Sequence, residues 1–265
     1  YLSTPPSPAE KYIRSSLLPN LCKDVVKNER YYSEFAIFET AQVFRDENYT
    51  SPYDEREKLP SQRKNVAGAF ASAGKDVTAL FRKAKGVIEM MPRYTHMEGF
   101  TFRQTEKPVW ADNVVWLNIY LGEEKVGALA LLAKKVSMAC GIKNMNVMLF
   151  QLDQDSLVPL KSRTNTFTHL AEYPMTDYDI SLLVDGSVQW KDVAQTVRGI
   201  KSELLHGAAF VDEYRGKQVP AGKKSLTLRL AIGSKDKTLT SAEIEEVASG
   251  VLNKIAKRFG AELRR

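Results

Sequence analysis

The carboxyl-terminal third of the chain contains the feature that most constrains its fold, a strict alternation of aliphatic and polar residues over 225–232. The alternating aliphatic residues are Leu226, Leu228, Leu230 and Ile232. Such a period of two is typical of a strand with one buried face, because successive side chains point to opposite sides of a sheet. Downstream, Thr240 and Glu243 have the spacing of a helical capping box, and Gly260 suits a left-handed helix end. A strand followed by a long capped helix is therefore predicted.

The order of the predicted elements defines the type of domain. We expect a strand at 179–184, a helix over 190–205, strands at 209–214 and 225–232, a helix from 241 and a strand at 261–264. This is the ferredoxin-like βαββαβ order, which places both helices on one face of an antiparallel sheet. The other face is then open and carries Ser225, Thr227 and Arg229. Single-stranded RNA is often read on such a face, but the aromatic signature of the common RNA-recognition module is absent. A small docking domain is the competing interpretation.

The preceding part of the chain mixes helical and strand periods and predicts a domain built on an antiparallel sheet. Apolar residues spaced by four predict a helix over 15–26, with Pro19 in its first turn. A second helix is expected over 77–91. The expected strands cover 35–44, 66–71, 110–121, 125–132 and 147–152. Residues 116–121 are too apolar for a strand with one solvated face, so this sheet is expected to be covered on both faces or buried in an interface.

A polar stretch without helical or strand periodicity, centred on 161–166, separates the two parts. We therefore expect one domain over 1–160, a linker over 161–172 and a second domain over 173–265. The fold class is α+β. Because the chain begins with Tyr1 instead of Met, we expect it to be a piece of a longer polypeptide or a trimmed chain.

Composition limits the class and compartment of the protein. Hydrophobic residues at 43% and charged residues at 26% exclude a disordered or low-complexity chain. No apolar run approaches the ~20 residues that cross a bilayer, and the amino end lacks the pattern of an export signal. Cys22 and Cys140 are too few for a disulfide framework and are expected to be reduced thiols. A cytoplasmic protein with no membrane association is predicted.

Basic residues are concentrated near the carboxyl end of a chain whose net charge is +6. Residues 214–230 contain five cations and no acid, and residues 254–265 contain five cations against Glu262. If the fold brings these segments together, they would form a patch that faces phosphate groups. The alternative is an ordinary solvated surface, which is the usual role of a charge run.

The sequence offers little of the chemistry that a self-sufficient enzyme needs. His96, His169 and His206 have no second His or Cys at metal-ligand or triad spacing, so no catalytic or metal-binding residue is predicted. None of the glycines forms a dinucleotide or phosphate-binding loop. Glu39 has no neighbouring carboxylate and is expected to be a structural, salt-bridged residue.

Several motifs resemble those of one family. In the carboxyl-terminal part they are Tyr214-Arg215-Gly216-Lys217, Pro220, Gly222-Lys223-Lys224-Ser225-Leu226, Leu228-Arg229-Leu230, Thr238-Leu239-Thr240, Glu243 and Arg258-Phe259-Gly260-Ala261-Glu262-Leu263-Arg264. They resemble the ferredoxin-fold anticodon-binding domain of bacterial phenylalanyl-tRNA synthetase beta subunits. The upstream motifs are Ile13-Arg14-Ser15-Ser16-Leu17-Leu18-Pro19, Ile37-Phe38-Glu39, Val43-Phe44 and Lys85-Gly86-Val87. They are similar to the class II synthetase-like domain of the same subunit, so the resemblance spans nearly the whole chain.

The resemblance implies a division of labour between two subunits. In this family an alpha subunit activates the amino acid, and the degenerate class II domain of the beta subunit braces it in an α2β2 heterotetramer. An active class II site has an Arg two residues before a Glu and a second Arg after a late Gly-rich motif. Ile37 stands two residues before Glu39, and residues 127–132 contain no Arg. Because an aliphatic side chain cannot bind a triphosphate, residues 1–160 are expected to be non-catalytic. ATP and magnesium are then expected only in the full complex, with no cofactor in this chain.

The expected partners are the alpha subunit and tRNA(Phe). Phosphate contacts are expected from a set of cations in the second domain, namely Arg215, Lys217, Lys223, Lys224 and Arg229. Where the family usually has two Arg, this chain has Asp177-Tyr178, so either the contact there is weaker or Tyr178 stacks on a base. The alternative function is a free-standing paralogue that acts as a protein-interaction module without RNA binding.

Overall fold

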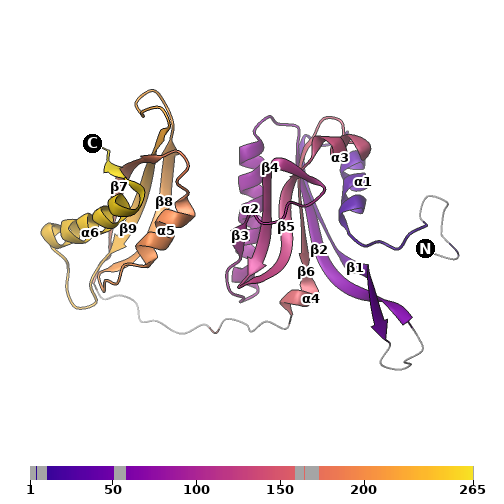
Figure 1. The fold of residues 1–265 in the computed structure, drawn as a ribbon, viewed down its shortest axis with the longest axis horizontal. Helices are drawn as coiled ribbons and strands as arrows, with labels where there is room; N and C mark the ends of the chain where they lie inside the picture. Colours follow the sequence, from indigo (N-terminus) through magenta and orange to yellow (C-terminus); the bar gives the residue numbers. More distant parts are fainter. Residues whose placement is uncertain (1–3, 5–10, 51–57, 159–163, 165–172, 265) are drawn as a thin grey trace. The chain divides into compact units, whose positions relative to one another are not determined.

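The computed structural model describes residues 4, 11–50, 58–158, 164 and 173–264 (Figure 1). The chain divides into two compact units, Tyr1–Asn165 and Thr166–Arg265. The predicted linker, 161–172, lies outside the described residues apart from Thr164. Among the described residues, no helix has both the length and the apolar character that a bilayer crossing requires.

The first unit is built on a six-stranded antiparallel sheet with the order β1-β2-β6-β5-β4-β3. Its strands are β1 (Glu34–Thr50), β2 (Lys58–Ser72), β3 (Thr101–Arg103), β4 (Ala111–Leu121), β5 (Glu124–Leu132) and β6 (Asn146–Asp153). Each expected strand is present, and β1 and β2 extend well beyond the predicted bounds. The short strand β3 was not predicted, because three residues are too few to show a period of two.

Two helices cover opposite faces of this sheet, as Figure 1 shows. The helix α1 (Leu18–Asn28) has Pro19 in its first turn and packs on a core that includes Val147 and Leu149 of β6. The helix α2 (Val77–Tyr94) packs on a second core that includes Met148 and Phe150, the alternate residues of the same strand. The apolar run of β6 is therefore buried on both sides, and of the two predicted alternatives the structure shows a sheet covered on both faces at this strand. Two short helices, α3 (Lys134–Ala139) and α4 (Gln154–Leu157), complete the unit.

The second unit has the predicted ferredoxin-like order, with a four-stranded antiparallel sheet arranged as β10-β7-β9-β8. Its elements are β7 (Thr176–Asp185), α5 (Trp190–Arg198), β8 (Leu205–Tyr214), β9 (Lys223–Ile232), α6 (Ser241–Phe259) and β10 (Glu262–Leu263). A single core contains alternate residues of β7 and β9 together with residues of both helices. Both helices therefore pack on one face of the sheet.

The ends of the two helices follow local signals in the sequence. At the start of α6, the Thr240 hydroxyl accepts from the Glu243 amide and the Glu243 carboxylate accepts from the Thr240 amide, as predicted. Gly260 ends this helix with φ of 61°, a left-handed conformation that favours glycine. In contrast, α5 stops at Arg198 and is shorter than the predicted 190–205, because Gly199 forms its end and β8 begins at Leu205.

Candidate functional site

The register of the second sheet determines which side chains share a surface. Tyr178 pairs with Leu230, and Asp179 pairs with Arg229. Since Ile180 and Leu230 lie in the helix-covered core, Asp179 and Arg229 project from the opposite, open face. The predicted open face therefore exists and carries Arg229. Ser225 was predicted to point outward. It is only 2% exposed, because it lies on β9, which is the strand between β7 and β8.

The open face pairs its principal cation with acids. The Arg229 guanidinium donates from Nε and Nη2 to the two carboxylate oxygens of Asp179, at 2.7 and 2.8 Å. Its Nη1 lies 3.7 Å from an oxygen of Asp177. The hydrogen bonds with Arg229 lower the pKa of Asp179, and those with Asp179 raise the pKa of Arg229. The positive charge predicted for this face is thus compensated by two carboxylates.

Tyr178 lies on the other side of the sheet. It occupies the same side of β7 as Ile180 and packs against the helix-covered core. The structure therefore does not bring Tyr178 together with Arg229, although both were predicted to contact RNA. Any stacking by Tyr178 would take place away from the open face.

Glu213 holds two of the other predicted cations. Its carboxylate accepts from Lys224 Nζ at 2.7 Å and from Arg215 Nε at 2.9 Å. Burial acts to raise the pKa of Glu213, but the hydrogen bonds from Lys224 and Arg215 outweigh this effect and lower it. Only 6% of the Lys224 side chain is exposed, so its ammonium faces Glu213 instead of solvent. Lys224 is a structural ion-pair residue in this fold.

The last two predicted cations differ in their surroundings. Lys223 Nζ lies 3.0 Å from a carboxylate oxygen of Glu262. Lys217 is exposed, and no ion pair is formed by it within the described part of the chain. Of the five predicted cations, four are thus compensated by carboxylates of the same unit.

A second group of cations lies on the helix side of this unit, where the prediction did not place the site. A groove of about 380 Å³ is lined by Gln195, Thr196, Gly199, Lys254, Lys257 and Arg258. Arg258 Nη1 donates to the Thr196 hydroxyl at 3.0 Å, and Lys254 Nζ donates to the Gly199 carbonyl at 3.3 Å. The basic run that begins at Lys254 is visible in the sequence, but its proximity to α5 depends on how the two helices pack.

In the first unit, Ile37 is the residue that the resemblance compares with the nucleotide-binding Arg of an active class II site. Ile37 packs against the α1-side core. Arg14 donates from Nη1 to Glu39 at 2.8 Å and from Nε to the Gln42 carbonyl at 2.8 Å. Glu39 is therefore a salt-bridged structural residue, as predicted.

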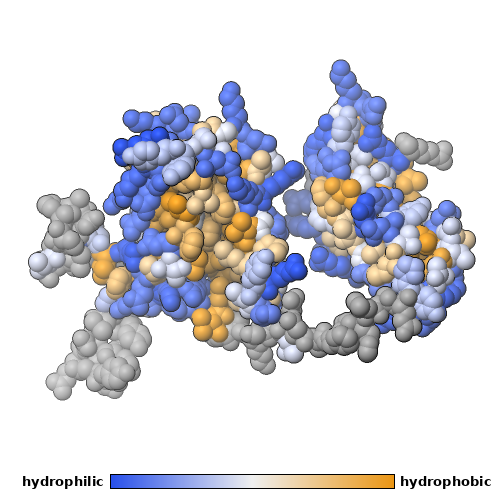
Figure 2. Space-filling model, turned by 180° about the vertical axis from the view of Figure 1, so that it is seen from behind, coloured by the Kyte–Doolittle hydropathy of each residue, from blue (hydrophilic) through white to orange (hydrophobic). Residues whose placement is uncertain are grey.

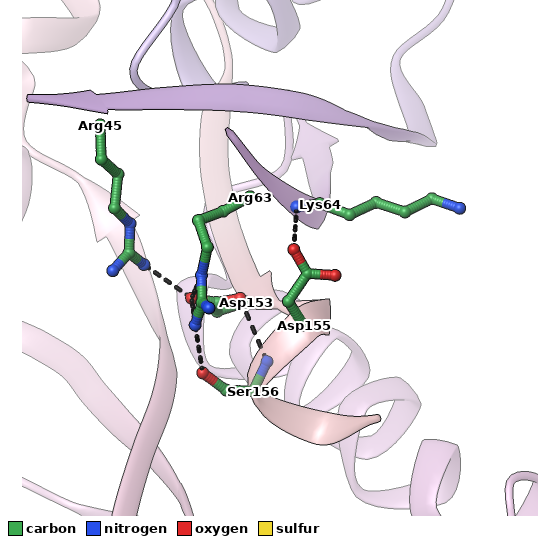
Figure 3. A network of polar contacts seen from close by, with 6 residues as sticks. All are labelled: Arg45, Arg63, Lys64, Asp153, Asp155 and Ser156. Atoms are coloured by element: carbon green, nitrogen blue, oxygen red, sulfur yellow. Dashed lines mark hydrogen bonds and ion pairs between the residues drawn. The ribbon is translucent and has the colours of Figure 1, made fainter. Parts of the chain in front are cut away.

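Two further arginines of the same sheet converge on one acid (Figure 3). Arg45 Nη2 and Arg63 Nη2 lie 2.6 and 3.1 Å from Asp153 Oδ2. Asp153 also accepts from the Ser156 amide and so caps α4, while Arg63 donates to the Ser156 hydroxyl at 3.0 Å. Sequence reasoning did not identify this network, because Asp153 lies 108 residues from Arg45 and 90 from Arg63. Within the described residues, no group of three His, Cys, Asp or Glu could hold a metal ion.

These two units define a class of protein. The family models that match them describe a tRNA synthetase domain and an anticodon-binding domain, so the class is that of aminoacyl-tRNA synthetase chains. Residues 1–154 match the phenylalanyl tRNA synthetase beta chain CLM domain, and residues 171–264 match the ferredoxin-fold anticodon binding domain. The chain belongs to the phenylalanyl-tRNA synthetase beta chain family, as its motifs indicated.

Curated relatives agree with this assignment. The chain is 25% identical to a phenylalanine–tRNA ligase beta subunit of Desulfotalea psychrophila, over 99% of this chain and 34% of the relative. It is 29% identical to that of Bacillus licheniformis, over 99% of this chain and 33% of the relative. The chain thus spans about a third of the length of these relatives. Among solved structures, a pyrrolysyl tRNA synthetase of Desulfitobacterium hafniense aligns with 55% of this chain and 48% of its own, at 14% identity and a TM-score of 0.44.

Proposed function

We propose that this chain is part of the beta subunit of a phenylalanine–tRNA ligase, in which it braces a catalytic alpha subunit and binds the anticodon arm of tRNA(Phe). The observation that carries the proposal is the presence, in one chain, of the beta-chain domain and the anticodon-binding domain in succession. The proposed role is to position other molecules, with bond making left to the alpha subunit.

The contacts of the first unit support a non-catalytic role. Ile37 supplies no guanidinium for a triphosphate, and Glu39 is held by Arg14. Arg45 and Arg63, which come from the same pair of long strands, bind Asp153. The residues present therefore do not fit a bound ATP with magnesium, and we assign both to the full complex.

The surface of the first unit supports a bracing role. Figure 2 shows apolar residues gathered over one face of this unit. The unit exposes large apolar side chains, including Phe38 at 79%, Val114 at 77% and Val109 at 95%. A face on which apolar residues gather, as in Figure 2, is characteristic of surfaces that bind other proteins, whereas single exposed apolar residues are common on any protein. An α2β2 assembly in the cytoplasm is the form that we propose for the complex.

Co-expression with an alpha subunit of the family tests the proposal. We expect the two polypeptides to purify together and the mixture to attach phenylalanine to tRNA(Phe). Light scattering of the purified complex gives its stoichiometry. Adenylate formation by the isolated 265-residue chain, supplied with phenylalanine, ATP and magnesium, would contradict the non-catalytic assignment.

One observation favours a second function, that of a paralogue that binds protein and not RNA. On the open face, Asp177 and Asp179 oppose Arg229, so that face offers little net positive charge. Titration of labelled tRNA(Phe) with the chain at two salt concentrations separates the two functions. RNA binding that weakens as salt rises supports the first, and the absence of binding supports the second.

A further inference from the structure

We propose that the second unit contacts RNA phosphates through the groove between α5 and α6, on the helix side of its sheet, and not through the open face. The α5–α6 groove is defined by Gln195, Thr196, Gly199, Lys254, Lys257 and Arg258. This inference rests on the proposed tRNA-binding function and specifies the surface that performs it.

The groove joins two segments that lack acidic residues. Residues 193–202 and 250–261 contain no Asp or Glu, and they carry the cations Arg198, Lys201, Lys254, Lys257 and Arg258. Contacts between α5 and α6 bring these segments together, as the bonds from Lys254 to Gly199 and from Arg258 to Thr196 demonstrate. The packing of α5 against α6 therefore brings the cations of two distant segments together at the α5–α6 groove.

The groove cations are not compensated in the way that the sheet cations are. Lys254, Lys257 and Arg258 form no ion pair with any carboxylate of the described residues. On the sheet, by comparison, Arg229 is bound by Asp179 and Lys223 by Glu262. A cluster of cations without neighbouring carboxylates attracts polyanions. Its binding free energy also benefits most from the counterions that the polyanion releases.

One guanidinium of the groove, that of Arg258, is oriented by a hydrogen bond to a buried hydroxyl. The buried Thr196 hydroxyl donates to the Asp192 carbonyl at 2.7 Å and accepts from Arg258 Nη1 at 3.0 Å. Arg258 is therefore oriented before any ligand binds, while Lys254 and Lys257 are exposed beside it. A hydrogen-bonded guanidinium beside two exposed ammonium groups suits the phosphodiester backbone of RNA, which needs charge and hydrogen-bond donors but no base readout.

The test compares two triple variants of the 265-residue chain that remove equal charge. The first, Lys254→Gln with Lys257→Gln and Arg258→Gln, neutralises the groove. The second, Lys75→Gln with Lys191→Gln and Lys235→Gln, neutralises three exposed cations outside the groove, of which Lys75 lies in the first unit. Binding of a labelled tRNA(Phe) transcript is measured from low to high salt, with inorganic phosphate and polyglutamate as competitors.

We expect the groove variant to bind about tenfold more weakly at low salt. Its affinity should also depend less on salt, with the magnitude of the slope of log K against log salt reduced by about two. The matched variant should bind nearly as the unchanged chain does. A double variant, Lys254→Gln with Lys257→Gln, keeps the Arg258–Thr196 bond and should show an intermediate loss even if the triple variant folds poorly.

The outcomes separate this inference from the proposed function. If the unchanged chain binds no tRNA, the proposed function fails. If it binds tRNA and the two triple variants weaken binding equally, or not at all, the groove is not the contact surface although the function stands. Retained tRNA binding by the groove variant, together with loss of polyglutamate binding, would assign the groove to an acidic protein instead.

Discussion

Across the ladder between β7 and β9, Arg229 and Asp179 face each other and share two hydrogen bonds of 2.7 and 2.8 Å on the open face of the sheet. The pair lies in register, so the strands themselves hold both groups at this separation. The carboxylate of Asp179 occupies the Nε–Nη2 edge of the Arg229 guanidinium, so this edge cannot bind a phosphate at the same time. The open face is therefore poorly suited to RNA unless Asp179 is neutralised.

Asp179→Asn gives the first prediction. The change removes the anion that binds Arg229 and leaves a side chain of nearly the same shape. We expect RNA affinity at low salt to rise by a few fold, with a steeper salt dependence, because one more cation becomes available. Titration of labelled tRNA with both chains provides the measurement. Combined with Arg229→Gln, the change should lose this gain, and a gain that persists would show that Arg229 is not its source.

The second prediction concerns the pH dependence of the α6 cap. A hydrogen bond from Lys237, followed by bonds from the amide and hydroxyl of Thr240, lowers the pKa of Glu243 from 4.5 to about 2. Because folding favours the ionised form, this stabilisation is complete above pH 4.5 and is lost as pH falls through about 2. Glu243→Gln keeps an acceptor for the cap but removes the charge.

Thermal unfolding between pH 2 and pH 7 tests this prediction. We expect the Gln variant to have a lower Tm than the unchanged chain at pH 7 and the difference to disappear near pH 2. Glu245→Gln, on the exposed side of the same helix, serves as the control. An equal effect from both changes would indicate general charge repulsion instead of the cap.

Several features of the second unit could be predicted because they depend on neighbouring residues. The alternation over 225–232 and the spacing of Thr240 and Glu243 are local patterns, and both produced the expected elements. The same alternation, extended one residue upstream, places Lys224 on the side of Leu226. The burial of Lys224 was not predicted, because the strand was expected to begin at Ser225. In the structure β9 begins at Lys223.

Other features could not be predicted because they depend on residues far apart in the sequence. Asp179 and Arg229 are 50 residues apart, and Arg258 is 62 residues from Thr196. No local pattern relates such partners, so a run of cations does not reveal which of its members are compensated by acids. The short elements β3 and α4 were missed for a different reason, since three or four residues carry no periodic signal.

The third prediction concerns thiol reactivity. Burial, with added contributions from the neighbouring Cys140, raises the pKa of Cys22 to about 12. At pH 8 the thiolate of Cys22 should be roughly a thousandfold rarer than that of a thiol with its ordinary pKa. Cys22 is also buried at 3% exposure, whereas Cys140 is partly exposed. We expect iodoacetamide to modify Cys140 first in the native chain and both thiols at similar rates in urea. Peptide mass spectrometry over time provides the measurement, and faster native labelling of Cys22 would contradict the prediction.

The last prediction concerns the network of the first unit shown in Figure 3. Asp153 is 11% exposed, binds the guanidinium groups of Arg45 and Arg63, and caps α4. Asp153→Ala removes the acid that both cations share, so we expect a loss of about 2–3 kcal/mol in the free energy of unfolding, with the partial exposure of both arginines limiting the effect. Asp155→Ala is a matched control. Asp155 accepts one hydrogen bond from the Lys64 amide, so its substitution should cost about 1 kcal/mol or less.

Urea unfolding followed by the fluorescence of Trp110 and Trp116, in a chain with Trp190→Phe, reports on the first unit. Equal losses from the two alanine variants would show that the shared carboxylate has no special role, and RNA affinity should not change in either variant because the proposed contacts lie in the second unit.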